Sequence, residues 1–300
     1  MTDNTDNIEQ EPSYRPNVSD NEEPIKKLEN KLNDLDDKLS NDKTLLDLEL
    51  GESHTTPREV LNVMKEHLES FVRAMDEFVE FIKKENIDTI FAIDKSGRYP
   101  AMILEEIYSK RNELSKLPMI KFINGHNLME FGKKGFDSIE SEKQDIKDYL
   151  RSKPDTKIAL LEEYTSMEQY LNLAKELIKQ LGHPDNQIFT ATITHDQKAS
   201  PKANYPGKSD SEFSHPIKDY ISLRLADTAI YDKSADTSEP IYNSIKLLSR
   251  LKEDDFSKIN FSLYSSKLED CNLSDETKQT MRLRSEWLDT AIKYFVEKHY

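Results

Sequence analysis

The segment Ile158-Ala-Leu-Leu-Glu-Glu-Tyr-Thr-Ser-Met-Glu-Gln-Tyr-Leu171 decides the fold class. An apolar run of strand length reaches two adjacent acids and then enters a helical pattern, which Gly182 closes. A buried strand that leads directly into a helix is the repeating unit of a parallel sheet. We therefore expect an α/β protein and look for similar units on both sides.

Strand-like and helix-like segments alternate around this unit. Strands are predicted at Ile87–Ile93, Met119–Ile123, Lys157–Leu161 and Gln187–Thr194, and helices at Pro100–Leu114, Glu142–Arg151 and Met167–Leu181. Such alternation predicts a parallel sheet that is flanked by helices and joined by right-handed crossovers.

A long helix is expected before the first strand. Thr56-Pro57-Arg58-Glu59 combines a Thr cap, Pro at the first helical position and Glu three residues after the cap. A broad apolar stripe follows to about Lys84. His67 lies in this stripe, and we interpret it as a packed histidine rather than a ligand.

The sequence predicts four regions. Residues 1–24 are acidic and nearly devoid of apolar side chains, which predicts a disordered tail. Residues 25–55 form a short amphipathic helix and a linker, residues 56–200 the α/β domain, and residues 201–300 a loop and a mostly helical C-terminal extension. The extension holds a polar loop over His195–His215 and helices at Ile241–Leu251 and Ser274–Tyr300.

The helix at 25–39 has two interpretations. Ile25, Leu28, Leu32, Leu35 and Leu39 share one seam, over only about two heptads. The seam serves either self-association and the docking of a protein partner, or packing against the chain's own domain.

Composition narrows the class of protein. The net charge of −15 argues against nucleic acid and anionic membranes as partners. Residues 1–55 alone carry 15 acids against 6 Lys and Arg, so the α/β domain is only mildly acidic. Cys271 is the single cysteine, which rules out an internal disulfide and fits a reducing cytoplasm. With no signal-like start and no apolar run near ~20 residues, we expect a cytoplasmic chain.

Two turns carry candidate ligand groups. Asp94-Lys95-Ser96-Gly97-Arg98 follows the first strand and leads into a helix, so it offers a hydroxyl, two cations and backbone amides to an anion. An ordinary turn with exposed charges is the alternative. Glu162 and Glu163 are expected at the end of the third strand, where carboxylates accept hydrogen bonds from ribose hydroxyls. Thr165 and Ser166 either cap the next helix or donate to a phosphate.

Together the two turns resemble the type I phosphoribosyltransferase family, over roughly residues 56–200. Asp94–Arg98 is similar to that family's diphosphate loop, with Tyr99 intervening before Pro100, and Ile158–Tyr164 is similar to the strand and acid pair of its motif for phosphoribosyl diphosphate (PRPP). The resemblance implies a phosphoribosyltransferase-like fold, a phosphoribosyl or nucleotide ligand, and Mg²⁺ if the chain is active.

The family's phosphate loop has no counterpart after the acid pair. Met167-Glu168-Gln169-Tyr170 stands where the family has a small Ser/Thr-Gly-x-Thr loop. Two like charges ~4 Å apart repel by about 4 kcal/mol at an effective dielectric near 20, so Glu168 opposes a phosphate there. The stretch 124–135 takes the place of a mobile loop and is either a lid that carries Lys133 and Lys134 or a solvated loop. His126 and His195 are weaker candidates for acid–base work.

We therefore predict a phosphoribosyltransferase-like protein with a degenerate phosphate loop, which binds a nucleotide-like ligand or a protein partner without ordinary catalysis. One alternative is an active, divergent phosphoribosyltransferase that uses PRPP and Mg²⁺. Another is a scaffold that acts through the acidic tail and residues 25–39.

Overall fold

The computed structural model describes residues 22–41, 56–93, 98–111, 116–123, 125–135, 140–165, 169–195, 202–209 and 275–300. The predictions for residues 1–21, for Ile241–Leu251 and for Cys271 lie outside these residues. Within the described part of the chain, no helix is both long enough and apolar enough to cross a membrane.

At the centre of the fold, the described residues form a sheet of five parallel strands in the order β2-β1-β3-β4-β5. The strands are β1 (Thr89–Ile93), β2 (Met119–Ile123), β3 (Ile158–Thr165), β4 (Ile188–His195) and β5 (Lys208–Ser209). The α/β class and the parallel sheet predicted from the sequence are confirmed. All five residues of β1 are buried, as expected for a strand that is covered on both faces.

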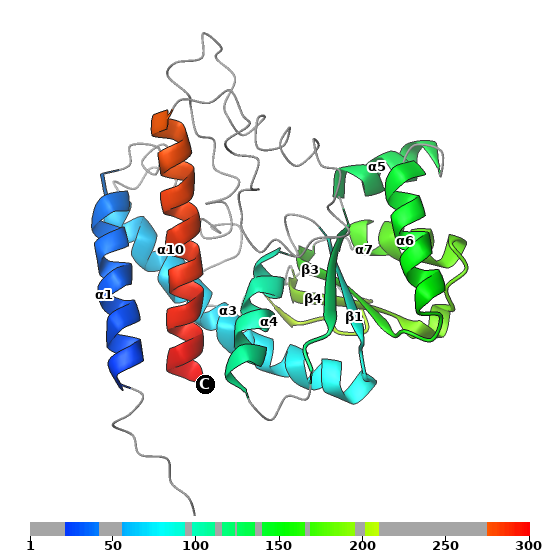
Figure 1. The fold of residues 1–300 in the computed structure, drawn as a ribbon, viewed down its shortest axis with the longest axis horizontal. Coiled ribbons are helices and arrows are strands. Elements are labelled where there is room, and N and C mark those ends of the chain that lie inside the picture. Colours follow the sequence, from blue (N-terminus) through cyan, green and yellow to red (C-terminus); the bar gives the residue numbers. More distant parts are fainter. Residues whose placement is uncertain are drawn as a thin grey trace, which may run out of the picture.

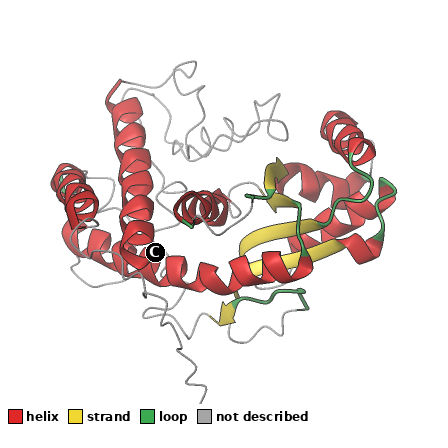
Figure 2. Cartoon of the chain, turned by 60° about the horizontal axis from the view of Figure 1, so that its bottom comes forward, coloured by secondary structure: helices red, strands yellow, loops and turns green. Residues whose placement is uncertain are grey.

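Helices cover both faces of the sheet (Figures 1 and 2). The first face packs against α3 (Pro57–Glu85) and α4 (Arg98–Lys110). The second face packs against α5 (Gly125–Lys134), α6 (Glu140–Ser152) and α7 (Gln169–Gln180). A short 3₁₀ turn, η3 (Asp185–Gln187), leads into β4.

The long helix α3 begins as its sequence predicts. Thr56 caps it, the Oγ1 of Thr56 accepts a hydrogen bond from the Glu59 amide, and the Glu59 side chain binds back to the Thr56 amide. The helix ends at Asn86, which takes a left-handed conformation with φ of 54°. His67 is buried in α3.

The first and last helices of the described chain pack side by side. Figure 1 shows α1 (Glu22–Leu39) beside α10 (Asp275–His299), with α3 running from this pair to the sheet. Leu32, Leu35 and Leu39 are buried against α3 and α10, so the seam of α1 packs against its own chain. The helix begins at Glu22, so residues 22–24 are helical rather than part of a tail.

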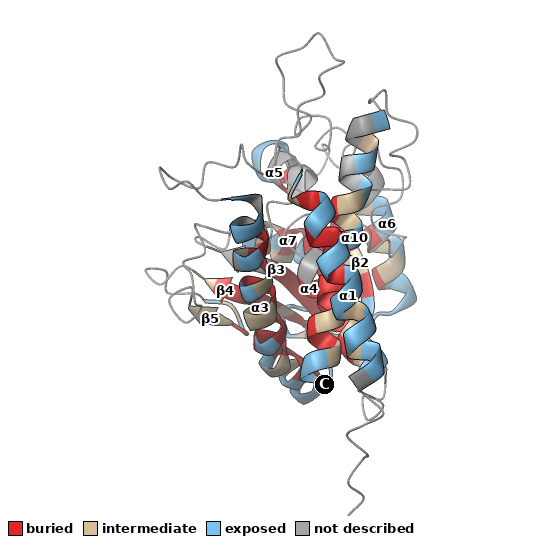
Figure 3. Cartoon of the chain, turned by 90° about the vertical axis from the view of Figure 1, so that its left-hand side faces the viewer, coloured by how far each residue is buried: buried red, intermediate tan, exposed pale blue. Residues whose placement is uncertain are grey.

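Burial distinguishes the strands from the outer helices (Figure 3). The strands β1 and β4 are almost wholly buried and the edge strands β2 and β5 less so, whereas α1 and α3 are buried on one side and exposed on the other.

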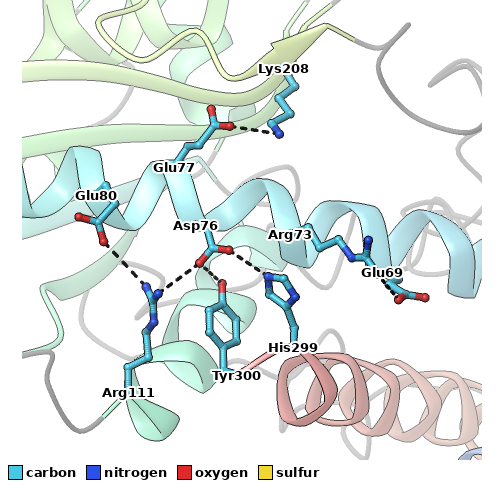
Figure 4. A network of polar contacts seen from close by, with 9 residues as sticks. All are labelled: Glu69, Arg73, Asp76, Glu77, Glu80, Arg111, Lys208, His299 and Tyr300. Carbon is cyan, nitrogen blue, oxygen red and sulfur yellow. Dashed lines mark hydrogen bonds and ion pairs between the residues drawn. The ribbon is translucent and has the colours of Figure 1, made fainter. Parts of the chain in front are cut away.

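A polar network fixes the end of α10 to α3 (Figure 4). Asp76 of α3 accepts hydrogen bonds from the Tyr300 hydroxyl at 2.7 Å and, at 2.9 Å, from the Nε2 of His299. Arg111, just after α4, lies 3.6 Å from the same carboxylate and over the Tyr300 ring. Burial, and then the bond to Asp76, raises the pKa of Tyr300. The network therefore ties α4, α10 and α3 together.

Three local predictions are wrong. The stretch 124–135 is not a lid or a solvated loop, because residues 125–134 form α5, with Leu128 and Phe131 buried in the core. The third strand does not stop at Leu161 but continues to Thr165. Part of the loop predicted after His195 returns to the sheet, where Ala191 bridges to Tyr205 and β5 pairs with β4.

Candidate functional site

The order of the strands places a topological switch point between β1 and β3. The chain leaves β1 through α4 on the first face and reaches β2, whereas it leaves β3 through α7 on the second face and reaches β4. The two connections diverge at the carboxyl ends of neighbouring strands. In open parallel sheets this switch point is where ligands bind.

The pairing of β1 with β3 brings the starts of the two predicted turns together. The ladder ends at Ala92 and its register partner Leu161, and Ile93 and Glu162 are the next residues of the two strands. Residues 94–97 follow β1 and residues 166–168 follow β3. The turns predicted to hold the ligand therefore leave neighbouring strands at the same edge of the sheet, with β3 continuing three residues past the level of Ile93.

Most of the predicted site residues lie wholly or partly outside the described residues. Asp94, Lys95, Ser96, Gly97 and Ser166 lie outside the described residues. The backbone of Arg98 begins α4, and the backbones of Glu163 and Thr165 belong to β3, but their side chains are outside the description.

Glu162 is the predicted site residue whose side chain is placed. It lies within β3, 6% exposed, rather than after the strand. The predicted position of the acid pair beyond the end of the strand is wrong, because the ladder between β3 and β4 continues to the pair Thr165 and His195. Glu162 is thus part of the sheet, and its carboxylate is held by strand geometry.

Buried threonines of β4 accompany Glu162. Because side chains alternate along a strand, Glu162 shares the second face with Leu160, and its register partner Thr192 shares it as well. Thr192 and Thr194 are fully buried, and the Thr192 hydroxyl donates to the Thr194 carbonyl at 2.6 Å. We call Glu162, Thr192 and Thr194 the polar corner.

Sequence reasoning missed these threonines, although a signal was available. Thr190-Ala-Thr-Ile-Thr194 places a hydroxyl at every second position of a strand that is covered on both faces. Such alternation in a covered strand gives one polar face and one apolar face. Thr190 has a structural role, because its amide and hydroxyl both donate to the Asn204 side chain.

The weaker candidates lie around this edge. His195 is the last residue of β4 and is half-buried, in register with Thr165. Lys133 and Lys134 are exposed in the last turn of α5. The side chain of His126 is outside the description.

The amino edge of the sheet is also polar, but its partners are internal. The Thr89 hydroxyl lies 2.6 Å from the Tyr149 hydroxyl and 3.1 Å from that of Thr156. The Nε2 of His183 donates to the Thr156 carbonyl at 2.9 Å, and burial lowers the pKa of this imidazole. Each of these groups is tied to a neighbouring element, which is typical of a structural network.

No metal-binding cluster is found in the described ranges: nowhere do three His, Cys, Asp or Glu side chains gather closely enough to hold an ion. No family model matches this sequence, and no curated protein matches it.

Proposed function

We propose that this chain binds a phosphoribosyl or nucleotide-like ligand at the carboxyl ends of β1 and β3, without ordinary transferase catalysis. The observation that carries the proposal is the buried carboxylate of Glu162 at the switch point of a parallel sheet. Burying a carboxylate costs free energy, which a core built only for stability avoids.

The polar corner suits a polyol better than it suits an anion. A carboxylate accepts hydrogen bonds from a vicinal diol, and threonine hydroxyls both donate and accept. A hydrogen bond to a charged group contributes about 1.5 to 3 kcal/mol, or roughly ten- to a hundredfold in affinity. The anionic part of the ligand would be held by the turn 94–97 and the amino end of α4, as the sequence predicts.

The length and the composition of the connection after β3 support the absence of ordinary catalysis. The strand ends at Thr165 and α7 begins at Gln169, so three residues join them. Ser166, Met167 and Glu168 are those residues. They include no glycine for close backbone approach and add a negative charge, both of which oppose a bound 5′-phosphate.

An active transferase is the competing proposal. Mg²⁺ keeps several waters and is bound through substrate phosphates and one or two carboxylates, so Glu162 could supply a single oxygen ligand near a bound diphosphate. The metal would neutralise the diphosphate as it leaves. In this alternative Glu162 holds the ribose or the metal, and Lys95 and Arg98 hold the diphosphate.

Titration calorimetry on the full chain tests the proposal. We expect PRPP with Mg²⁺, and ribose 5-phosphate alone, to give saturable heat with the wild-type chain. Glu162→Gln keeps the shape of the side chain and should weaken binding at least tenfold, and Thr194→Val should act in the same direction. Glu176→Gln, on the exposed side of α7, is the matched control and should bind like wild type.

Three outcomes separate the alternatives. Absence of heat with either compound at millimolar concentration would reject a phosphoribosyl ligand at this edge. Equal binding by wild type and Glu162→Gln, with both folded by circular dichroism, would reject the polar corner as the site. Release of diphosphate from PRPP, measured with candidate nitrogen nucleophiles and lost in Glu162→Gln, would favour the active enzyme.

A further inference from the structure

The most specific side-chain arrangement outside the sheet lies where α1 docks on α3 and α10. Asp36 of α1 is only 1% exposed. One of its carboxylate oxygens accepts a hydrogen bond from the indole Nε1 of Trp287 at 2.7 Å, and the other lies 2.6 Å from the Nζ of Lys65. A buried carboxylate between an indole and an ammonium group fixes the position of α1 on the surface formed by α3 and α10, which we call the α3–α10 groove.

The groove also recognises α1 by shape and charge. Leu32, Leu35 and Leu39 fill its apolar part. At the margins, Lys31 pairs with Glu286 of α10 at 2.9 Å, and Asp37 pairs with Arg58 of α3 at 2.8 Å. The groove is therefore built for a helix with the pattern Leu-x-x-Leu-Asp-x-x-Leu, which residues 32–39 provide.

The attachment of α1 is limited. Among its described side chains, those three leucines and Asp36 are buried, whereas Ile25 and Leu28 in its first half are only half-buried. Residues 42–55 separate α1 from the start of α3. An element whose buried side chains are confined to one short segment can undock without unfolding the rest of the protein.

From this geometry we infer that α1 is exchangeable and that two copies of the chain associate by docking α1 of each copy into the α3–α10 groove of the other. The occupant is specified by the groove itself, because α1 of a second copy brings the same leucines and the same Asp36 to Trp287 and Lys65. Exchange of an identical element is a low-cost route to a symmetric dimer. The inference does not depend on the ligand proposed for the sheet.

The concentration of the wild-type chain decides whether the closed monomer or the exchanged dimer dominates. Because residues 42–55 tether α1 to α3, its effective concentration relative to its own groove is in the millimolar range. The wild-type chain is therefore mostly a closed monomer at micromolar concentration. Exchange becomes visible when docking within one chain is made unfavourable.

Two single charge-reversal variants make docking of α1 within its own chain unfavourable. Asp36→Lys places an ammonium group opposite Lys65, and Lys65→Asp places a carboxylate opposite Asp36, so each variant repels its own α1. In a mixture, α1 of the Asp36→Lys variant fits the groove of the Lys65→Asp variant. α1 of the Lys65→Asp variant and the groove of the Asp36→Lys variant together keep the natural pair of Asp36 and Lys65. We expect each variant alone to sediment as a monomer at tens of micromolar and the equimolar mixture to sediment as a dimer.

The control carries both reversals in one chain. Asp36→Lys combined with Lys65→Asp restores an opposite-charge pair within the molecule, so this variant should remain monomeric, alone and in the mixtures. A mixture of the single variants that stays monomeric at 100 µM, with both chains folded by circular dichroism, would overturn the inference.

Trp287, the single tryptophan, provides a second measurement, which does not depend on the association of two variants. A synthetic peptide of residues 22–41 added to the Asp36→Lys chain should shift the Trp287 emission to shorter wavelength in a saturable way. With the wild-type chain the same peptide should cause little shift, because its own α1 already covers Trp287. A peptide with Asp36→Asn should bind at least tenfold more weakly. No shift with the Asp36→Lys chain up to millimolar peptide would reject the groove as a site for a second α1.

Discussion

The two faces of the sheet share the same strands but differ in chemistry. On the first face the buried side chains of β3 and β4 are apolar as far as Leu161 and Ile193, which lie shortly before the ends of these strands. On the second face Leu160 is followed by Glu162, and the matching positions of β4 are Thr192 and Thr194. Both faces are covered by helices, so exposure to water does not explain the difference.

The comparison shows how to separate structural from functional polarity in a core. At the amino edge, Thr89, Tyr149, Thr156 and His183 hydrogen-bond to one another across elements. The polar corner instead lies at the switch point, beside the turns after β1 and β3. Position relative to the strand ends, rather than burial alone, marks the second group as the candidate site.

The largest expected effect lies on the apolar face. Leu161→Ala removes a fully buried side chain and should lower the free energy of unfolding by about 2 to 5 kcal/mol. Urea denaturation followed by circular dichroism measures this change. Ligand affinity of the folded protein should stay within about threefold of wild type. A loss of stability below about 1 kcal/mol would mean that the two faces do not differ as described.

The neighbouring residue should behave in the opposite way. Glu162→Leu replaces a buried carboxylate with an apolar side chain, which removes the cost of burying a charge. We expect the urea midpoint to stay or rise while ligand binding is lost. If the variant instead loses more than about 2 kcal/mol, Glu162 is a structural carboxylate and the polar corner loses its functional meaning.

A smaller effect is expected at the amino edge. Tyr149→Phe removes the hydroxyl that lies 2.6 Å from Thr89 and should cost about 1 kcal/mol, the usual net value of one hydrogen bond. Tyr170→Phe on α7 is the control, because Tyr170 packs against the same side of the sheet without a described hydrogen bond. Thermal unfolding compares the two. Equal effects would remove the distinction between the two polar edges.

The smallest effect is a pH dependence at His183. Burial lowers the pKa of its imidazole below the ordinary value near 6.5, so the unfolded chain binds more protons in that range. Stability from this group is complete above about pH 6.5 and falls as the pH drops toward the folded pKa. The difference in unfolding free energy between wild type and His183→Gln, measured from pH 8 to pH 5, isolates the contribution of His183. A difference that is independent of pH, or that grows as the pH falls, would contradict a lowered pKa at His183.

The raised pKa values of Glu105 and Glu106 make stability change with pH in the direction opposite to that of His183. Burial raises both where α4 faces α10. They contribute stability as the pH falls through their folded values, so the comparison at His183 must be made against a variant rather than against pH alone.

The sequence predicted the strands well because each is a continuous apolar run between turns. The strand β2 was predicted with the bounds that the structure has, and β1 within two residues. The end of β3 was missed because two glutamates favour a loop by propensity, whereas the ladder with β4 extends the strand past them. Tertiary pairing overrode local preference at this point.

The helix α5 was missed for a related reason. Gly125 and Gly132 lower its helix propensity, and the stretch was interpreted as a lid or a solvated loop. In the structure Gly132 permits a close approach to α7, because a Cβ at this position would lie 2.9 Å from the Cδ2 of Leu173. The residue that argued against a helix is the one that lets two helices pack.

The candidate site was predicted in outline only. The sequence placed its two turns at the ends of two strands, and the strand order made those strands neighbours. The threonines of β4 and the pairing of α1 with α10 depend on contacts between distant segments, which local patterns do not contain. Asp36 shows the limit, because its partner Trp287 is 251 residues away in the sequence.

That separation has a consequence for biosynthesis. The leucine seam of α1 leaves the ribosome long before α10 exists to cover it. At roughly 5 to 20 residues per second, 250 residues take about 12 to 50 s. For that time the nascent chain presents an uncovered amphipathic helix to chaperones and to other nascent copies on the same messenger RNA. Translation speed over the last third of the chain would therefore influence how much protein emerges as monomer.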